Sequence, residues 1–84
     1  MTKRFACACC GYLTLSEEPP GTYEICPVCS WEDDLVQFQD PTYIGGANRV
    51  SLEEARANFQ LFGARSRKDL PRVRAPHNEE LLDH

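Results

Sequence analysis

Two Cys-x-x-Cys pairs constrain this chain more than any other feature. Cys7 and Cys10 form the first pair, Cys26 and Cys29 form the second, and fifteen residues lie between the pairs. This spacing is typical of a tetrathiolate zinc site, in which four deprotonated sulfurs surround one divalent cation. Closing such a site adds the binding energy of the metal to the free energy of folding. The pattern therefore predicts one structural Zn²⁺ with these four cysteines as its ligands.

The short length of the chain makes such a metal staple necessary. The 84 residues give room for one domain, and a domain of this size buries too little apolar surface to be stable by a wide margin. Structural zinc contributes apparent binding free energies on the order of 10 kcal/mol, comparable to the net stability of a whole domain. We therefore expect loss of the metal to unfold at least the N-terminal half.

The fifth cysteine, Cys9, lies inside the first pair and is the natural non-ligand, because Cys7 and Cys10 keep the two-residue gap. An odd number of cysteines would leave one thiol outside a disulfide framework, whereas four ligands and one spare thiol suit a reducing compartment. We interpret Cys9 as a small, partly buried apolar side chain; a reactive or alternative ligand thiol is the sharper alternative. His77 and His84 lie in a polar segment and are not expected to bind the metal.

Charge is unevenly distributed along the chain, whose formal net charge is −4. Residues 1–64 carry four basic and nine acidic groups, residues 65–74 carry five basic groups and one acid, and residues 75–84 carry three acids. A general affinity for nucleic-acid backbone needs a net basic surface and is therefore disfavoured. No apolar run has the length of a membrane span and no signal peptide is visible, so we expect a cytoplasmic protein without a membrane partner.

Short β-prone segments adjoin both cysteine pairs. Residues 12–15 alternate in polarity before a segment of turn formers, and residues 22–25 lead directly into Cys26. A hairpin formed by these two segments would bring the cysteine pairs together. Each pair resembles a knuckle, a tight turn whose backbone N–H groups point at the sulfurs. Gly11 can adopt the positive φ that such a turn needs, whereas the second knuckle has Ser30 at the same place.

Two helices are expected after the second pair. The acidic start of residues 30–36 favours a short helix, and the turn formers of residues 40–48 favour a loop. The clearest helix begins at Ser51, which forms a capping box with Glu54, and ends at Gly63. Its apolar face, expected to cover the hairpin, comprises Leu52, Ala55, Phe59 and Phe62.

The chain thus divides into a metal-binding domain over residues 1–64 and a charged, proline-containing arm over residues 65–84. The arm has little apolar content, so we expect it to be extended, either flexible or packed on the domain surface, with a final turn at residues 79–82. Its basic side chains are Arg65, Arg67, Lys68, Arg72 and Arg74. They are either a solvated tail docked on the acidic surface of the chain itself, or a contact arm for RNA, DNA or an acidic protein.

Trp31 directly follows the second knuckle. Core packing is the expected role of the only tryptophan in so short a chain, and an exposed aromatic that contacts a partner is the alternative. Together these features predict a small α+β metal-stapled domain. It has a zinc-ribbon-like β-hairpin with two cysteine knuckles, one C-terminal helix and an extended tail.

Several motifs in a fixed order resemble those of the small bacterial cysteine-rich CPCC proteins. They are CACCGYLTL, YEICPVCSWEDD, DPTYIGGANR and SLEEARANF, within residues 6–64. The resemblance implies a zinc-binding bacterial domain whose biochemical role is not established. Ala8 stands where the name motif of the family has proline, which makes the first knuckle less rigid at a cost of about 1 kcal/mol or less. The shared segment from Gly45 to Arg49 either positions the following helix or forms a recognition surface.

Four cysteine ligands would leave the metal no open position for a substrate, so we predict no enzymatic activity and no small-molecule substrate. The leading functional hypothesis is a zinc-binding adaptor that contacts another protein. One alternative is a nucleic-acid-binding zinc ribbon that uses the basic residues of 65–74. Another is a rubredoxin-like electron carrier, because four thiolates bind iron as well as zinc.

Overall fold

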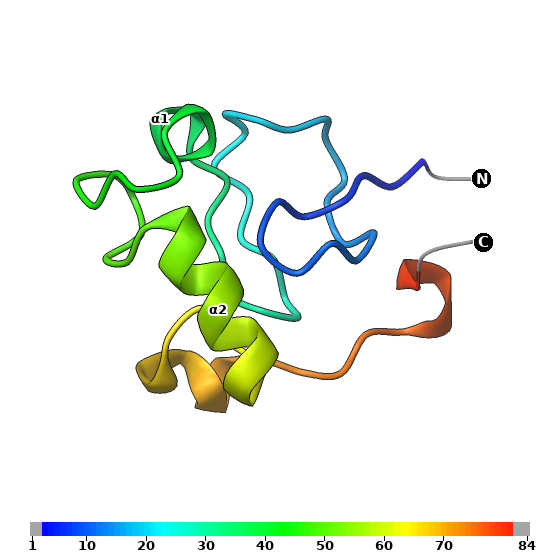
Figure 1. Cartoon of the computed structure of the whole chain (residues 1–84). Coiled ribbons are helices and arrows are strands. Elements are labelled where there is room, and N and C mark those ends of the chain that lie inside the picture. Colours follow the sequence, from blue (N-terminus) through cyan, green and yellow to red (C-terminus); the bar gives the residue numbers. More distant parts are fainter. Residues whose placement is uncertain (1–2, 82–84) are drawn as a thin grey trace.

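Helices and two isolated β-bridges form the regular structure of residues 3–81, the residues that the computed structural model describes. The two α-helices are α1 (Leu35–Gln39) and α2 (Leu52–Phe62), and they are followed by the 3-10 helices η1 (Arg67–Arg72) and η2 (Asn78–Glu80). Figure 1 shows the N-terminal loops packed along α2, with η1 folded beneath the end of this helix. None of the helices in residues 3–81 has the length and apolar character needed to span a bilayer.

Each cysteine pair lies at the tip of its own short antiparallel hairpin. Phe5 pairs with Leu15 around the first pair, and Ile25 pairs with Glu32 around the second. The two segments that flank each knuckle therefore bond to each other through their backbones. Across residues 3–81, these two local hairpins and side-chain packing hold the domain together, and no extended sheet forms.

The predicted hairpin between residues 12–15 and 22–25 is absent from the described part of the chain. No backbone hydrogen bond joins the two segments there, and a side chain links them instead, since the carboxylate of Glu24 accepts from the backbone N–H of Ser16 at 3.0 Å. The zinc-ribbon-like hairpin of the predicted fold is thus replaced by one hairpin for each pair. The physical reason is that a strand next to a knuckle has already paired with the strand on the other side of it.

Helix α1 begins later than the acidic run predicts. Glu32, on the returning side of the second knuckle, forms a bridge to Ile25, and the helix starts at Leu35. Asp34 is its N-cap, with Oδ1 accepting from the backbone N–H of Gln37 at 2.9 Å. Only the last residue of the acidic run therefore caps the helix, because the bridge to Ile25 fixes Glu32 in an extended conformation.

Helix α2 begins and ends as predicted. Ser51 Oγ accepts from the backbone N–H of Glu54 at 3.0 Å, and Gly63 ends the helix with a φ of 91°. Leu52 and Ala55 are fully buried on the apolar face and pack on the cysteine knuckles, with Phe59 beside them. The helix therefore covers the site that the four cysteines form.

The loop between the two helices is fixed by one buried amide side chain. Gln37 Nε2 donates to the carbonyls of Tyr43, Asn48 and Val50 at 3.0, 3.2 and 3.0 Å, and Gln37 Oε1 accepts from Asn48 Nδ2 at 2.8 Å. A Cβ added at Gly46 would lie 2.7 Å from the Gln37 side chain, so only glycine allows this approach. Gly46 and Asn48 of the segment 45–49 thus help to fix the loop that leads from α1 into α2.

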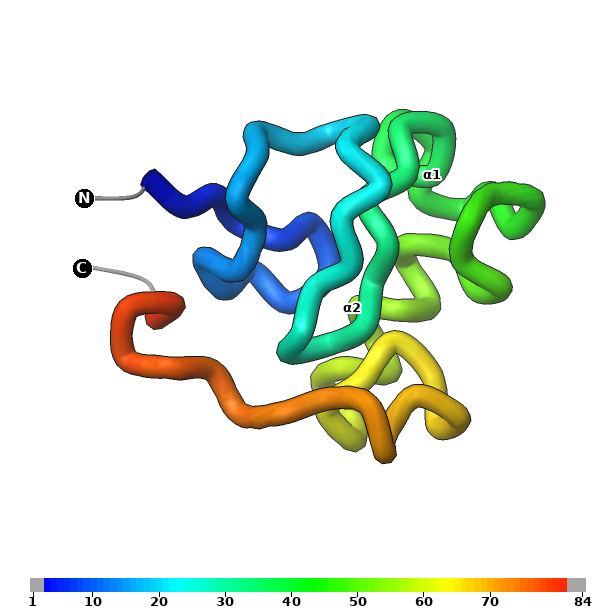
Figure 2. Tube along the Cα trace, turned by 180° about the vertical axis from the view of Figure 1, so that it is seen from behind, coloured from blue at the N-terminus to red at the C-terminus, as the bar shows by residue number. Residues whose placement is uncertain are grey.

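The arm packs against the knuckles through its backbone. The N–H groups of Arg65 and Arg74 donate to the carbonyls of Cys29 and Pro27, and the carbonyl of Glu80 accepts from Leu13 at 2.7 Å. In both views the η2 segment lies beside the N-terminal segment (Figures 1 and 2). Of the final turn predicted at residues 79–82, residues 79 and 80 lie in η2 and residue 81 follows it, whereas residue 82 lies outside the described residues.

Candidate metal centre

The two knuckles adopt the same backbone turn. Gly11 N–H donates to the Cys7 carbonyl at 2.8 Å, and Ser30 N–H donates to the Cys26 carbonyl at 2.8 Å. Both residues have a positive φ, 82° for Gly11 and 75° for Ser30. The serine therefore takes the left-handed conformation that the sequence suggested only for the glycine, because the turn geometry is required at both ends of the site.

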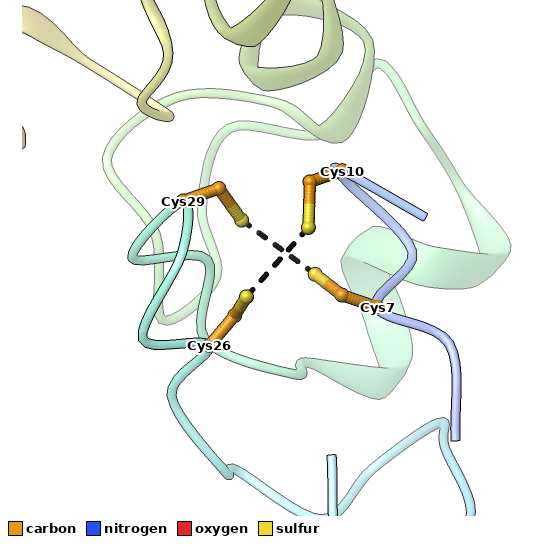
Figure 3. A group of neighbouring side chains, drawn as sticks. All are labelled: Cys7, Cys10, Cys26 and Cys29. Atoms are coloured by element: carbon orange, nitrogen blue, oxygen red, sulfur yellow. Dashed lines mark hydrogen bonds between the residues drawn. The ribbon is translucent and has the colours of Figure 1, made fainter. Parts of the chain in front are cut away.

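The two turns bring four sulfurs to one point. The Sγ atoms of Cys7, Cys10, Cys26 and Cys29 all lie within 4.8 Å of one another. The sulfurs of Cys7 and Cys29 are 3.6 Å apart and those of Cys10 and Cys26 are 3.7 Å apart, and all four side chains point toward one another (Figure 3). A regular tetrahedron with metal–sulfur bonds of about 2.3 Å has edges of about 3.8 Å. The donor set thus fits one tetrahedrally bound metal ion.

Electrostatics within the group also favour a bound cation. Hydrogen bonds with Cys10, Cys29 and Cys7 lower the pKa of Cys26, to which Thr14 Oγ1 also donates at 3.0 Å. The contact with Cys26 in turn raises the pKa of Cys10. Neighbouring thiolates repel one another, so the four groups cannot all be ionised unless a positive charge lies between them. A divalent cation at this point would supply that charge and would let all four sulfurs act as ligands.

Comparison with protein-family models identifies the family of the chain. The model of the cysteine-rich CPCC proteins matches residues 5–80, nearly the whole chain. The chain belongs to the cysteine-rich CPCC family. The match begins before the first knuckle and continues through the basic arm to η2. A comparison with curated proteins gives no match.

In this CPCC domain the site is shielded by apolar side chains. Cys26 and Cys29 are completely buried and Cys7 is 2% exposed, whereas Cys10 is half-buried. Val28, Trp31 and Leu52 are buried in the same cluster. Low exposure keeps water from Cys7, Cys26 and Cys29 and strengthens the electrostatic interactions that their sulfurs make.

Trp31 belongs to this shield and is only 1% exposed. The core role expected from the sequence is therefore correct, and the alternative of Trp31 as a partner contact is wrong for this fold. Its backbone N–H donates to Cys29 Sγ at 3.4 Å, and the N–H of Cys9 donates to Cys7 Sγ at the same distance. These donors partly offset the negative charge of the thiolates.

The remaining candidate ligands lie outside the group. Cys9 is 8% exposed and packs in the core without joining the four sulfurs, as expected for a small apolar side chain. The ring of His77 lies 3.8 Å from the carboxylate of Glu79, away from the metal site. His84 is outside the described residues. One contact that sequence reasoning missed is the Thr14 hydroxyl, which no spacing rule connects to Cys26.

The five basic side chains of the arm have different environments. Arg65 Nε donates to Asp69 at 2.7 Å, and Arg74 donates to both carboxylate oxygens of Glu80 at 2.8 Å. Arg67 stacks on the ring of Phe62, with 4.5 Å between the guanidinium carbon and the ring centroid. Lys68 and Arg72 are exposed, the latter 3.7 Å from Asp69. The acids that these residues meet are within the arm, and not in the acidic run of residues 32–34.

Proposed function

We propose that this CPCC chain is a non-enzymatic zinc-binding domain that acts as an adaptor for another protein. The observation that carries the proposal is the closed group of four sulfurs, three of them from buried cysteines and one from the half-buried Cys10. A metal held by four protein ligands has no open position at which a substrate could bind, so its role is to stabilise the fold. The thiolates need a reducing compartment such as the cytoplasm.

Zinc is the preferred metal because a tetrathiolate site of paired Cys-x-x-Cys motifs is typical of structural zinc. Iron would occupy the same four sulfurs and would give an electron carrier. Metal analysis of protein purified from cells grown with both metals distinguishes the two. We expect one equivalent of zinc and no visible colour, whereas a red, iron-loaded protein would overturn the choice.

The adaptor role is supported by apolar side chains that the fold leaves exposed around α1. Hydrogen bonds from Tyr23 N–H to the Asp33 carbonyl and from Tyr43 N–H to the Asp40 carbonyl place both flanking segments next to this helix. We call the exposed apolar side chains between residues 23 and 44 the α1 surface: Tyr23, Ile25, Leu35, Val36, Phe38, Tyr43 and Ile44. We infer that these side chains form one patch, and a contiguous exposed apolar patch is typical of a protein-contact site. A partner with an apolar face and a basic rim would suit it, because residues 1–64 have a net negative charge.

A pair of matched substitutions tests this role. Val36 is 51% exposed in α1, and Leu61 is 78% exposed in α2, outside the α1 surface. Each is replaced by aspartate in the metal-loaded full chain, which is then used to capture partners from extract by cross-linking. We expect Val36→Asp to lose a partner that wild type and Leu61→Asp both retain. Equal capture by all three proteins, or no metal-dependent partner at all, would refute the adaptor proposal.

Nucleic-acid binding through the arm stays the second hypothesis. Two of its five cations, Arg65 and Arg74, are held in ion pairs with Asp69 and Glu80. Fewer charges therefore remain to bind the phosphates of a nucleic-acid backbone. Titration with RNA and DNA over a range of salt concentrations tests it, and absence of binding at low salt would dispose of it.

A further inference from the structure

A basic cavity lies between the loop that precedes α2 and the 3-10 helix η1. Its volume is about 320 Å³, and it is lined by Arg49, Val50, Arg65, Ser66, Lys68, Asp69 and Arg72. These residues come from two segments that α2 separates in sequence, so the cavity exists only because η1 folds back beside the loop. It lies apart from the metal centre, since none of the four cysteines lines it.

The charge of this basic cavity is opposite to that of the molecule. Its lining holds four cationic side chains and one carboxylate, a net charge of +3, in a chain whose formal net charge is −4. The carboxylate, Asp69, is only 4% exposed and already accepts from Arg65 at 2.7 Å and from Ser66 at 2.6 Å. Burial opposes ionisation of Asp69, but these hydrogen bonds outweigh it and lower the pKa of the carboxyl. Asp69 therefore holds the Arg65 side chain in a fixed position in the lining of the cavity.

The cations at the rim are free to meet a ligand. Among residues 3–81, Arg49 and Lys68 form no ion pair within 4.0 Å, and Arg72 has only the 3.7 Å contact with Asp69. All three side chains are exposed at the cavity. Several unpaired cations around a concave site favour an anion with several oxygens, because each oxygen can accept from a different donor.

A second cavity opens directly beside the first. Its volume is about 420 Å³, and it shares Arg49, Val50, Ser66 and Lys68 with the basic cavity. Its other lining residues are Glu54, Asn58, Phe62 and Arg67. The Phe62 ring and Val50 give this cavity an apolar wall, and Arg67 stacks on that ring at 4.5 Å. A planar group placed here would have an aromatic ring and a guanidinium as neighbours.

We propose that the paired cavities bind a small phosphorylated ligand with a planar body, of the nucleoside diphosphate class. The phosphates would lie among Arg49, Lys68 and Arg72, and the planar body would lie against Val50 and Phe62. A continuous nucleic-acid strand fits less well, because the acidic surface of residues 1–64 would repel its backbone on either side. The proposal does not depend on the adaptor role, since it concerns a different surface.

Calorimetric titration of the metal-loaded full chain tests the proposal with ADP and inorganic pyrophosphate as probes. Both carry a diphosphate, but only ADP has a planar body. The variant is Lys68→Gln in the shared rim, and the matched control is Lys3→Gln, which removes the same charge from an exposed lysine that lines neither cavity. Removing one charged hydrogen bond to phosphate weakens binding roughly tenfold. We expect this loss for Lys68→Gln and less than about a twofold change for Lys3→Gln.

Further outcomes separate the parts of the proposal. Tighter binding of ADP than of pyrophosphate, with shifts in the NMR signals of Phe62 only for ADP, supports both cavities, because Phe62 lines the second cavity and not the first. Equal affinities for the two probes overturn the assignment of the second cavity. No binding of either probe at low salt, equal losses in the two lysine variants, or binding of oligonucleotides alone overturns the proposal as a whole. Metal content and circular dichroism of each variant show that the fold is intact.

Discussion

Ser30 has the backbone conformation that Gly11 has in the other knuckle, although serine adopts it at a cost. A left-handed φ brings the Cβ of an L-residue close to the backbone, which costs roughly 1–2 kcal/mol. Ser30 is held there because its N–H closes the turn with the Cys26 carbonyl at 2.8 Å and because the metal site needs that turn. At the scale of single residues, the domain thus stores strain next to a ligand.

Replacing Ser30 with glycine should relieve this strain. Since glycine also loses more entropy on folding, we expect a net gain of about 0.5–1 kcal/mol in the free energy of unfolding. Denaturant titration of the metal-saturated protein measures it, with Ser30→Ala as the control because alanine keeps the Cβ. A gain in the alanine variant equal to that of glycine would show that the hydroxyl, and not the φ angle, is the cause.

Glu80 gives a second prediction at this scale. Its side chain is 2% exposed and accepts two hydrogen bonds from Arg74, which lower its pKa from 4.5 to about 2; Arg4 and the N–H of His77 also face it. Because the folded state holds its proton less tightly than the unfolded state, the stabilisation is complete above pH 4.5. It is lost as the pH falls through about 2.

The titration of the Glu80 carboxyl by NMR checks this directly. We expect Arg74→Gln to move the pKa of Glu80 upward, toward its ordinary value, and Arg72→Gln to leave it unchanged, because Arg72 contacts Asp69 instead. An unshifted Glu80 in the Arg74 variant would contradict the assignment of the ion pair as the cause.

At the scale of elements, the loop of residues 40–50 determines where α2 lies. The side chains of Gln37 in α1 and Asn48 in the loop hydrogen-bond to each other, and Gln37 also donates to the surrounding carbonyls. Arg65 Nη1 extends the network by donating to Asn48 Oδ1 at 2.7 Å. The same asparagine accepts from the N–H of Glu32, next to the second knuckle, at 2.8 Å. One buried polar network therefore connects α1, the loop, the knuckle and the arm.

The two adjacent glycines of this loop should respond differently to alanine. A Cβ at Gly46 meets the fully buried side chain of Gln37 at 2.7 Å, which cannot move without breaking its hydrogen bonds. A Cβ at Gly45 meets the ring of Tyr43, which is 42% exposed and can rotate away. We expect Gly46→Ala to cost about 1–3 kcal/mol and Gly45→Ala to cost less than about 0.5 kcal/mol in unfolding free energy. Similar losses in both variants would contradict this account of the network.

At the scale of the whole molecule, we expect stability to depend on metal binding by the four cysteines. The core consists largely of the cysteines themselves with Leu15, Val28, Trp31 and Leu52 around them. Such a core is too small to fold 84 residues with a wide margin. The arm and α2 both contact the knuckles, so they too depend on the sulfurs being held together.

Removing the metal with a chelator at neutral pH should therefore unfold α2 and the arm as well as the knuckles. Structural zinc contributes on the order of 10 kcal/mol, which exceeds what the remaining packing supplies. Loss of helical circular dichroism and of amide NMR dispersion measures the unfolding, and added Zn²⁺ should restore both signals. A metal-free protein that keeps dispersed signals throughout residues 51–81 would contradict the dependence on the metal.

The sequence by itself determined the four-cysteine group, the bounds of α2 and the CPCC family, because local signals encode them: ligand spacing, a serine N-cap, a glycine C-cap and an ordered set of motifs. Tertiary structure decided the rest. Backbone pairing within each knuckle replaced the hairpin expected between residues 12–15 and 22–25. The same pairing moved the start of α1 to Leu35. The basic cavity has no sequence signal, since Arg49 and Lys68 meet only when η1 folds back beside the loop. Contacts between distant segments are set by packing and buried hydrogen bonds, which no local pattern records.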